Sequence, residues 1–309
     1  MLQTNQTFLI TFGIILMGFL IKHYGYIKEA EGKIISKFLM HTTFPALMII
    51  STARVNLQPA LSLIPLLCLT FGALTVGTAT WIFRKEPDKI RGILMMACGG
   101  SNVGLFGFPL IEGIWGTKAL VYAVMFDIGN TFMTFGVVYS IGNYFASKGH
   151  GKVSVRKILK RIFSLPPVTG MFIGLLINVL HIQLPDIAFD FLETLAKANK
   201  SLVLLLMGIY LSIELNKAQL KSAFKVLAIR YFYGLLLVTA LYFGLEPSLM
   251  RSVLIVLVIL PIGMTILPFS DEFNFDSRVA GTMVNLTLIC SFAIIWLLVL
   301  ALNLTTDIG

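Results

Sequence analysis

Long apolar stretches separated by short polar segments follow one another along the whole chain. A membrane-spanning helix needs about 20 apolar residues, because the hydrocarbon core of a bilayer is about 30 Å thick. Such stretches and short loops account for nearly all of the 309 residues. The pattern predicts an all-α integral membrane protein with about ten transmembrane helices, at residues 6–22, 34–53, 60–83, 90–111, 118–145, 165–182, 187–212, 222–244, 249–269 and 278–302.

Composition agrees with this prediction. Charged residues make up only 13% of the chain, too few to cover the surface of a soluble domain of this size. The net charge of +9 is better explained by loops that face anionic lipid and the cytoplasm than by binding to nucleic acid. The three cysteines lie singly in apolar stretches, which indicates buried apolar side chains and no disulfide framework.

The positions of lysine and arginine predict the orientation in the membrane. With the N-terminus outside, 19 of the 24 basic residues, Arg230 among them, fall in inner loops or at inner helix ends. The strongest signal is the segment 146–161, ASKGHGKVSVRKILKR. We therefore expect a multi-pass protein of the cytoplasmic (plasma) membrane with both termini outside.

This basic segment divides the chain into two halves of five predicted helices. We expect a first repeat at 1–147, a cytoplasmic linker at 148–164 and a second repeat at 165–309. Similar residues recur at a nearly constant spacing: Asn102 and Pro109 precede Pro261 and Pro268 by 159 residues, and Gly18-Phe-Leu-Ile precedes Gly174-Leu-Leu-Ile by 156. Because five is odd, the second copy must insert upside down, which is the inverted-repeat plan of many secondary transporters.

The fourth and ninth segments contain residues that interrupt helices. The stretch 98–109 holds four glycines before Pro109, and the ninth segment holds Pro261, Gly263 and Pro268. Unwound backbone is tolerated in a membrane only where protein or a water-filled cavity satisfies it. We expect the two broken helices to cross near the membrane midplane, where half-helix N-termini favour a carboxylate. The predicted substrate-binding residues are Asn102, Gly104, Pro109, Pro261, Pro268 and Asn285.

Asp127 lies well inside the fifth predicted span, and Asn130 follows it by one helical turn. A carboxylate at membrane depth is costly and marks a functional hypothesis. Asp127 could couple proton movement to substrate movement, or it could be a structural acid that accepts hydrogen bonds from freed backbone. Both interpretations stay open at this point.

The run SNVGLFGFPLIEGIWG, followed by MFDIGN, resembles the auxin efflux carrier family, which contains the plant PIN-type carriers and their bacterial relatives. The segments FPALMI (44–49), SLPPVTGMFIGLLIN (164–178) and SLVLLLMGIYL (201–211) resemble further parts of this family, so the similarity covers almost the whole chain. The long cytoplasmic loop of many plant members is absent, which favours a compact bacterial type of carrier.

The resemblance implies two inverted five-helix repeats with crossing fourth and ninth helices. It also implies an elevator-like cycle, with helices one, two, six and seven as scaffold and a homodimer formed through that scaffold. Family substrates are organic anions, including dicarboxylates in bacterial members. By motif match, Asn102 and Pro109 fall where members contact substrate, and Pro261 and Pro268 fall at the partner of that site.

We therefore expect a permease that moves a small organic anion, a mono- or dicarboxylate, by alternating access. No cofactor is expected, and coupling to H⁺ or Na⁺ is left open. The alternative is a cation/proton antiporter on a similar inverted-repeat fold. Such antiporters carry an adjacent acidic pair, whereas Asp127 stands alone. Nothing in the sequence resembles a metal site, a phosphate loop or a catalytic triad, so no enzyme is predicted.

Overall fold

The computed structural model describes residues 2–53, 59–147, 156, 159–160, 163–211 and 217–304. These residues are almost entirely helical, and the only β-type pairing among them is a single antiparallel bridge between Ser101 and Ile262. The longer helices are α1 (Leu2–His23), α2 (Glu29–His41), α3 (Thr43–Ala53), α4 (Leu63–Ile82), α5 (Asp88–Gly99), α6 (Phe108–Trp115), α7 (Leu120–Thr131), α8 (Tyr139–Ala146), α10 (Pro166–Val179), α11 (Asp186–Tyr210), α12 (Lys217–Gly244), α13 (Leu249–Leu257), α14 (Ile266–Glu272) and α15 (Ser277–Ala301).

Helix ends follow ordinary capping chemistry. Pro166 occupies the first turn of α10, where its missing N–H costs nothing. The side chain of Ser248 accepts a hydrogen bond from Arg251 N at the start of α13, and Asp276 accepts one from Arg278 N at the start of α15. The helices coincide with the predicted apolar segments to within a few residues at most ends.

Five helical segments among the described residues are long and apolar enough to cross a membrane. Three shorter apolar helices accompany them, at Phe8–His23, Val103–Trp115 and Pro166–Val179. The full set of ten crossings stays a prediction. The fourth and ninth predicted spans are each broken into two shorter helices, and α11 carries charged residues along its first half. Most of the predicted linker 148–164 lies outside the described residues.

The chain forms two compact units that interleave in sequence. Unit 1 consists of Met1–Leu61, Gly104–Val124 and Lys160–Leu211, and unit 2 of Ser62–Val103, Met125–Leu159 and Ser212–Gly309. Each unit therefore takes segments from both predicted repeats, and neither coincides with a half of the chain.

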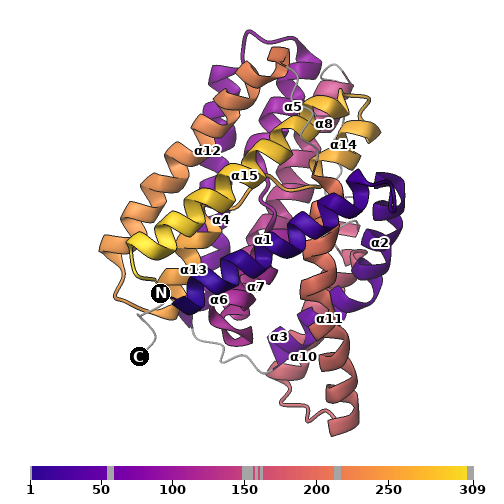
Figure 1. The fold of residues 1–309 in the computed structure, drawn as a ribbon. Helices are drawn as coiled ribbons and strands as arrows, with labels where there is room; N and C mark the ends of the chain where they lie inside the picture. Colours follow the sequence, from indigo (N-terminus) through magenta and orange to yellow (C-terminus); the bar gives the residue numbers. More distant parts are fainter. Residues whose placement is uncertain are drawn as a thin grey trace. The chain divides into compact units, whose positions relative to one another are not determined.

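Unit 1 is built from helices that touch backbone to backbone. α1 packs on α11, and α3 packs on α10 (Figure 1). A Cβ atom on Gly18 would lie 2.1 Å from Leu205 O, and one on Gly174 would lie 2.6 Å from Ile49 O. Because no side chain fits at these glycines, the helix axes approach as closely as backbones allow.

These two contacts in unit 1 are copies of each other. Gly18 and Gly174 are 156 residues apart, and so are Ile49 and Leu205, so one contact becomes the other when the partners are exchanged. The hydroxyl of Thr43 donates to Asn199 Oδ1 at 2.7 Å, and these two residues are also 156 apart. The spacing noticed at Gly18 and Gly174 in the sequence thus recurs in the packing.

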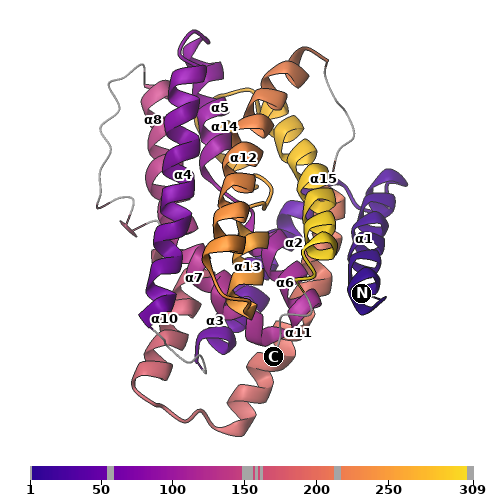
Figure 2. The same ribbon diagram turned by 90° about the vertical axis from the view of Figure 1, so that its left-hand side faces the viewer.

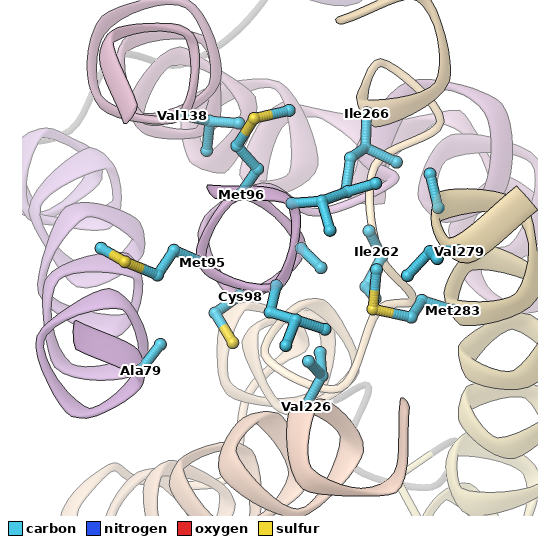
Figure 3. Close-up of a cluster of buried hydrophobic side chains, with 14 of the residues drawn as sticks. Ala79, Met95, Met96, Cys98, Val138, Val226, Ile262, Ile266, Val279 and Met283 are labelled. Carbon is cyan, nitrogen blue, oxygen red and sulfur yellow. The ribbon is translucent and has the colours of Figure 1, made fainter. Parts of the chain in front are cut away.

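Unit 2 is organised around α5, whose residues from Gly92 to Gly99 are all buried. α12 packs against α4 and α15, and α5 packs against α4, α8 and α12 (Figure 2). Figure 3 shows side chains pointing outward from α5, with Met95 on the side of Ala79 and Met96 next to Val138, and Cys98 belongs to the same buried cluster. α13 is buried from Arg251 to Leu257 in the same way. Two short helices with interrupted ends therefore lie in the interior of this unit.

Candidate functional site

Both predicted breaks are present, and in unit 2 the two interrupted segments pair with each other. α5 ends at Gly99, and Gly100 is extended with φ −100° and ψ 151°. Asn102 N donates to Pro261 O at 2.8 Å, and Gly263 N donates to Gly100 O at 3.2 Å. This short antiparallel pairing satisfies backbone groups that the broken helices leave free, as an apolar environment requires.

The register of this pairing agrees with the repeat spacing. Asn102 lies opposite Pro261, and these residues are the pair that the sequence relates by 159 positions. If two antiparallel strands are copies related by a two-fold axis, that axis passes midway between two residues that are both equivalent and opposite. Asn102 and Pro261 meet both conditions.

Pro109 and Pro268 do not lie at the helix breaks, where we expected them. The fourth helix opens at Gly100–Asn102, and Pro109 lies in the first turn of α6, after a π-helical turn at Val103–Gly107. Pro268 likewise lies in the first turn of α14 and is exposed. Pro109 and Pro268 therefore lie after the extended residues and not among them: Pro109 lies within the helical segment Val103–Trp115, directly after its π-helical turn, and Pro268 lies in the first turn of α14, where a missing N–H is tolerated.

Asn130, on α7, supports the fourth-helix break with its whole amide group. Its Oδ1 accepts from Ser101 N at 2.9 Å, and its Nδ2 donates to Ser101 O at 3.0 Å. The same Nδ2 donates to Asp127 Oδ1 at 2.9 Å. The predicted pair Asp127–Asn130 is therefore a hydrogen-bonded unit that contacts the crossover directly.

The ninth-helix break receives a lighter support from α15. Ile262 N donates to Thr287 Oγ1 at 3.2 Å, and this hydroxyl donates to Met283 O at 2.9 Å. Asn285, two residues before Thr287, is also buried, with 7% of its surface exposed. The backbone of Ile262 thus has one bond to a side chain of α15, whereas the backbone of Ser101 has two bonds to a single amide.

Asn102 is the least satisfied polar side chain of the crossover. Only 4% of its surface is exposed. Its Nδ2 has no hydrogen-bond partner among the described residues, although its backbone N–H is paired with Pro261. A buried amide nitrogen without an acceptor is costly, so an acceptor from a ligand would be favourable here.

Arg230, on α12, extends into the same place and is only 2% exposed. Its Nη1 donates to the carbonyl oxygens of Cys98 and Gly100, each at 3.0 Å. Its Nη2 donates to Ser101 Oγ at 3.0 Å and to Leu260 O at 3.1 Å. The guanidinium therefore binds both broken segments at once.

Sequence reasoning assigned Arg230 to the inner helix ends, among the orientation-setting charges, and this assignment is wrong. The signal that could have found it was its depth, since it lies eight residues inside the predicted span 222–244. At 1.5 Å per residue that depth is about 12 Å, too far for a side chain to reach the interface easily. A charge at this depth is by default a functional hypothesis.

The other predicted residues divide between the two units. Gly104 and Pro109 belong to unit 1, where a Cβ on Gly104 would lie 3.5 Å from the ring of Phe44. Asn102, Pro261, Asp127 and Asn130 meet in unit 2 through the bonds described above. Among the described residues, no three His, Cys, Asp or Glu side chains lie close enough to hold a metal ion.

Comparisons with known proteins show the family of this chain. Residues 5–299 match the model of a family described as membrane transport protein. An uncharacterized transporter of Methanothermobacter thermautotrophicus is 25% identical over 295 residues, covering 93% of this chain and 95% of its own. An uncharacterized transporter of Methanocaldococcus jannaschii is 25% identical over 218 residues, covering 66% of this chain and 68% of its own. Because the family match spans nearly the whole sequence, this chain belongs to the membrane transport protein family, the family of the auxin efflux carriers.

Proposed function

We propose that this membrane transporter is a secondary active permease for a small organic anion, a mono- or dicarboxylate, and that Asn102 binds the carboxylate. The observation that carries the proposal is the unpaired Nδ2 of Asn102, buried at the pairing of two interrupted helices. A carboxylate oxygen is an acceptor that this nitrogen can donate to. Broken helices of this kind hold the substrate in many transporters.

The charges around Asn102 favour an anion. Arg230 binds Gly100 O and Ser101 Oγ, which belong to the two residues directly before Asn102. Charge-assisted interactions at a buried position are stronger than those in water. A negatively charged ligand at the crossover would therefore meet a positive environment that is already in place.

Asp127 suggests how substrate and proton movement are coupled. Through Asn130 its carboxyl group is bonded to the same backbone that Arg230 binds. With Asp127 ionised, the charges of Asp127 and Arg230 balance. When a singly charged anion binds, one proton on Asp127 restores that balance. We therefore expect an anion and a proton to move together.

Repeated contacts in both units support the inverted-repeat arrangement. In unit 1 the contacts of Gly18 and Gly174 exchange under a shift of 156 residues. In unit 2 Asn102 and Pro261 are opposite each other and 159 residues apart. Two copies inserted with opposite orientation would produce this reciprocity. The elevator-like cycle, the outside termini, the plasma membrane and the homodimer remain part of this proposal.

The test is uptake of labelled malonate, malate and indole-acetate into proteoliposomes, with and without an imposed pH gradient. We expect gradient-driven accumulation of at least one anion, and loss of that uptake and of anion binding in Asn102→Ala. Asn178→Ala is the control, because its amide lies on α10 and already donates to Thr52 O at 3.1 Å. Unchanged anion affinity in a folded Asn102→Ala protein would contradict the assignment.

A cation/proton antiporter is the second candidate, and Asp127 is the observation that favours it. It predicts proton flux that a cation stimulates without any anion and that Asp127→Asn abolishes. The anion permease instead predicts that Asp127→Asn keeps anion binding and loses only the response to the pH gradient. Measuring both fluxes in the same proteoliposomes separates the two functions.

A further inference from the structure

The guanidinium of Arg230 occupies a cage of oxygen atoms. Cys98 O, Gly100 O, Ser101 Oγ and Leu260 O lie 3.0–3.1 Å from its two terminal nitrogens, and Ala97 O lies at 3.5 Å. The face of the Phe71 ring closes another side, with its centroid 5.6 Å from Arg230 Cζ. All the oxygens come from the two interrupted segments, and none belongs to a carboxylate.

Oxygen sets of this composition are typical of cation sites. Backbone carbonyls and hydroxyls are the ligands that alkali-metal and other hard cations prefer in proteins. In transporters with broken helices, coupling cations are bound by unwound carbonyls and by the C-terminal ends of half-helices, which carry partial negative charge. Cys98 and Gly100 stand at the C-terminal end of α5, so Arg230 fills the position such a cation would take.

Within the part of the chain that the structure describes, Arg230 forms no direct salt bridge with an acidic side chain, and its bonds go to these neutral oxygens. Arg251 provides a comparison. It is also buried, at 6% exposure, but its Nη1 donates to the carbonyls of Tyr242, in the last turn of α12, and of Leu245, in the connection before α13. The hydrogen bonds of Arg251 are consistent with a general role in packing, whereas Arg230 donates hydrogen bonds to oxygens of both broken helices.

We propose that Arg230 is a tethered cation that replaces an alkali-metal ion at the crossover. It makes binding of the anion independent of Na⁺, Li⁺ or K⁺, and its removal leaves an oxygen cage that takes such an ion. Arg230 acts here as a positioning residue, through the two segments it binds. The part of this inference that concerns anion binding rests on the proposed function. The oxygen cage around Arg230 can be tested without any anion.

The first readout is thermal stability of purified Arg230→Ala in detergent, in chloride salts of Na⁺, Li⁺, K⁺ or choline at equal ionic strength. We expect the melting temperature of the variant to rise with Na⁺ or Li⁺ and saturate, while the unaltered protein does not distinguish the salts. Guanidinium at millimolar concentration should also stabilise the variant. Urea has nearly the same shape and no charge, so it should not. Arg251→Ala is the control and should respond to none of them specifically.

The second readout is affinity for labelled malonate. We expect Arg230→Ala in choline to lose about tenfold or more in affinity, and to recover it with Na⁺ or guanidinium. Recovery with urea to the same extent, or no response of a folded variant to any cation, would overturn the proposal. A requirement of the unaltered protein for Na⁺ in malonate binding would also overturn the proposal.

Should Arg230→Ala fail to fold, Arg230→Lys takes its place, because an ammonium keeps the charge with fewer donors. We expect Arg230→Lys to bind malonate in choline, and a need for Na⁺ in that variant would contradict the idea. If the unaltered protein binds no anion at all, the proposed function fails, while the salt dependence of the melting temperature still decides the cation cage.

Discussion

In unit 1 α1 meets α11, and α3 meets α10, at glycines that bring backbones together, whereas in unit 2 the two interrupted helices meet through polar side chains. Gly18 and Gly174 leave no space for any other residue. Asn130, Thr287 and Arg230 instead hold extended backbone by hydrogen bonds. Close apolar packing resists rearrangement, while a polar network has donors and acceptors that a ligand can use. The comparison assigns rigidity to the first unit and ligand chemistry to the second.

The largest effect on stability should come from the glycine contacts. A Cβ on Gly208 would lie 2.0 Å from Ile15 O and 2.6 Å from Phe19 N, and neither backbone atom can move away alone. We expect Gly208→Ala to lower the free energy of unfolding by about 3 kcal/mol or more, because helices α1 and α11 must separate. Thermal melting in detergent measures this effect.

Gly13→Ala is the matched control, because Gly13 lies on α1, the helix that Gly208 contacts, with nothing within 4 Å of an added Cβ. Its melting temperature should stay the same or rise slightly. Equal melting temperatures for Gly208→Ala and Gly13→Ala would mean that close approach is not what stabilises unit 1.

A smaller loss is expected at the fourth-helix break. Asn130→Leu removes two bonds to Ser101 and one to Asp127. Only the two bonds to Ser101 join different segments, so at about 0.6 kcal/mol for each such bond in a membrane protein the loss is about 1 kcal/mol. Because Ser101 N–H and C=O are then left unpaired, we also expect faster hydrogen exchange at Ser101. Unchanged exchange there would show that another group takes over the role of Asn130.

The smallest loss is expected at the ninth-helix break. Thr287→Val removes the single acceptor of Ile262 N, for a loss of about 0.6 kcal/mol. Thr287→Ser keeps the hydroxyl and should retain most of the stability. A Thr287→Val variant less stable than Asn130→Leu would reverse the comparison between the two breaks and make α15 the main support of the crossover.

Much of this arrangement could be predicted from local sequence. The helices begin and end near the expected residues because apolar stretches and capping residues act over a few positions. The interruption of the fourth and ninth helices follows from the glycines at 99 and 100 and from Pro261, which disfavour a continuous helix wherever they occur. The sequence did not show that Pro109 and Pro268 follow the extended residues, because a proline either distorts the turn before it or lies in the first turn of a helix, according to its position.

The sequence by itself determined an α-helical membrane protein, the two interrupted helices, the spacing of the repeats and the family. Each of these depends on composition, on periodicity or on residues close together in the chain. Only the tertiary structure decided that Asn130 supports Ser101, that Asn102 Nδ2 lacks a partner and that Arg230 lies among the oxygens of both breaks. The residues joined in these contacts are up to about 130 positions apart, and whether a polar atom finds a partner depends on side chains that distant helices supply.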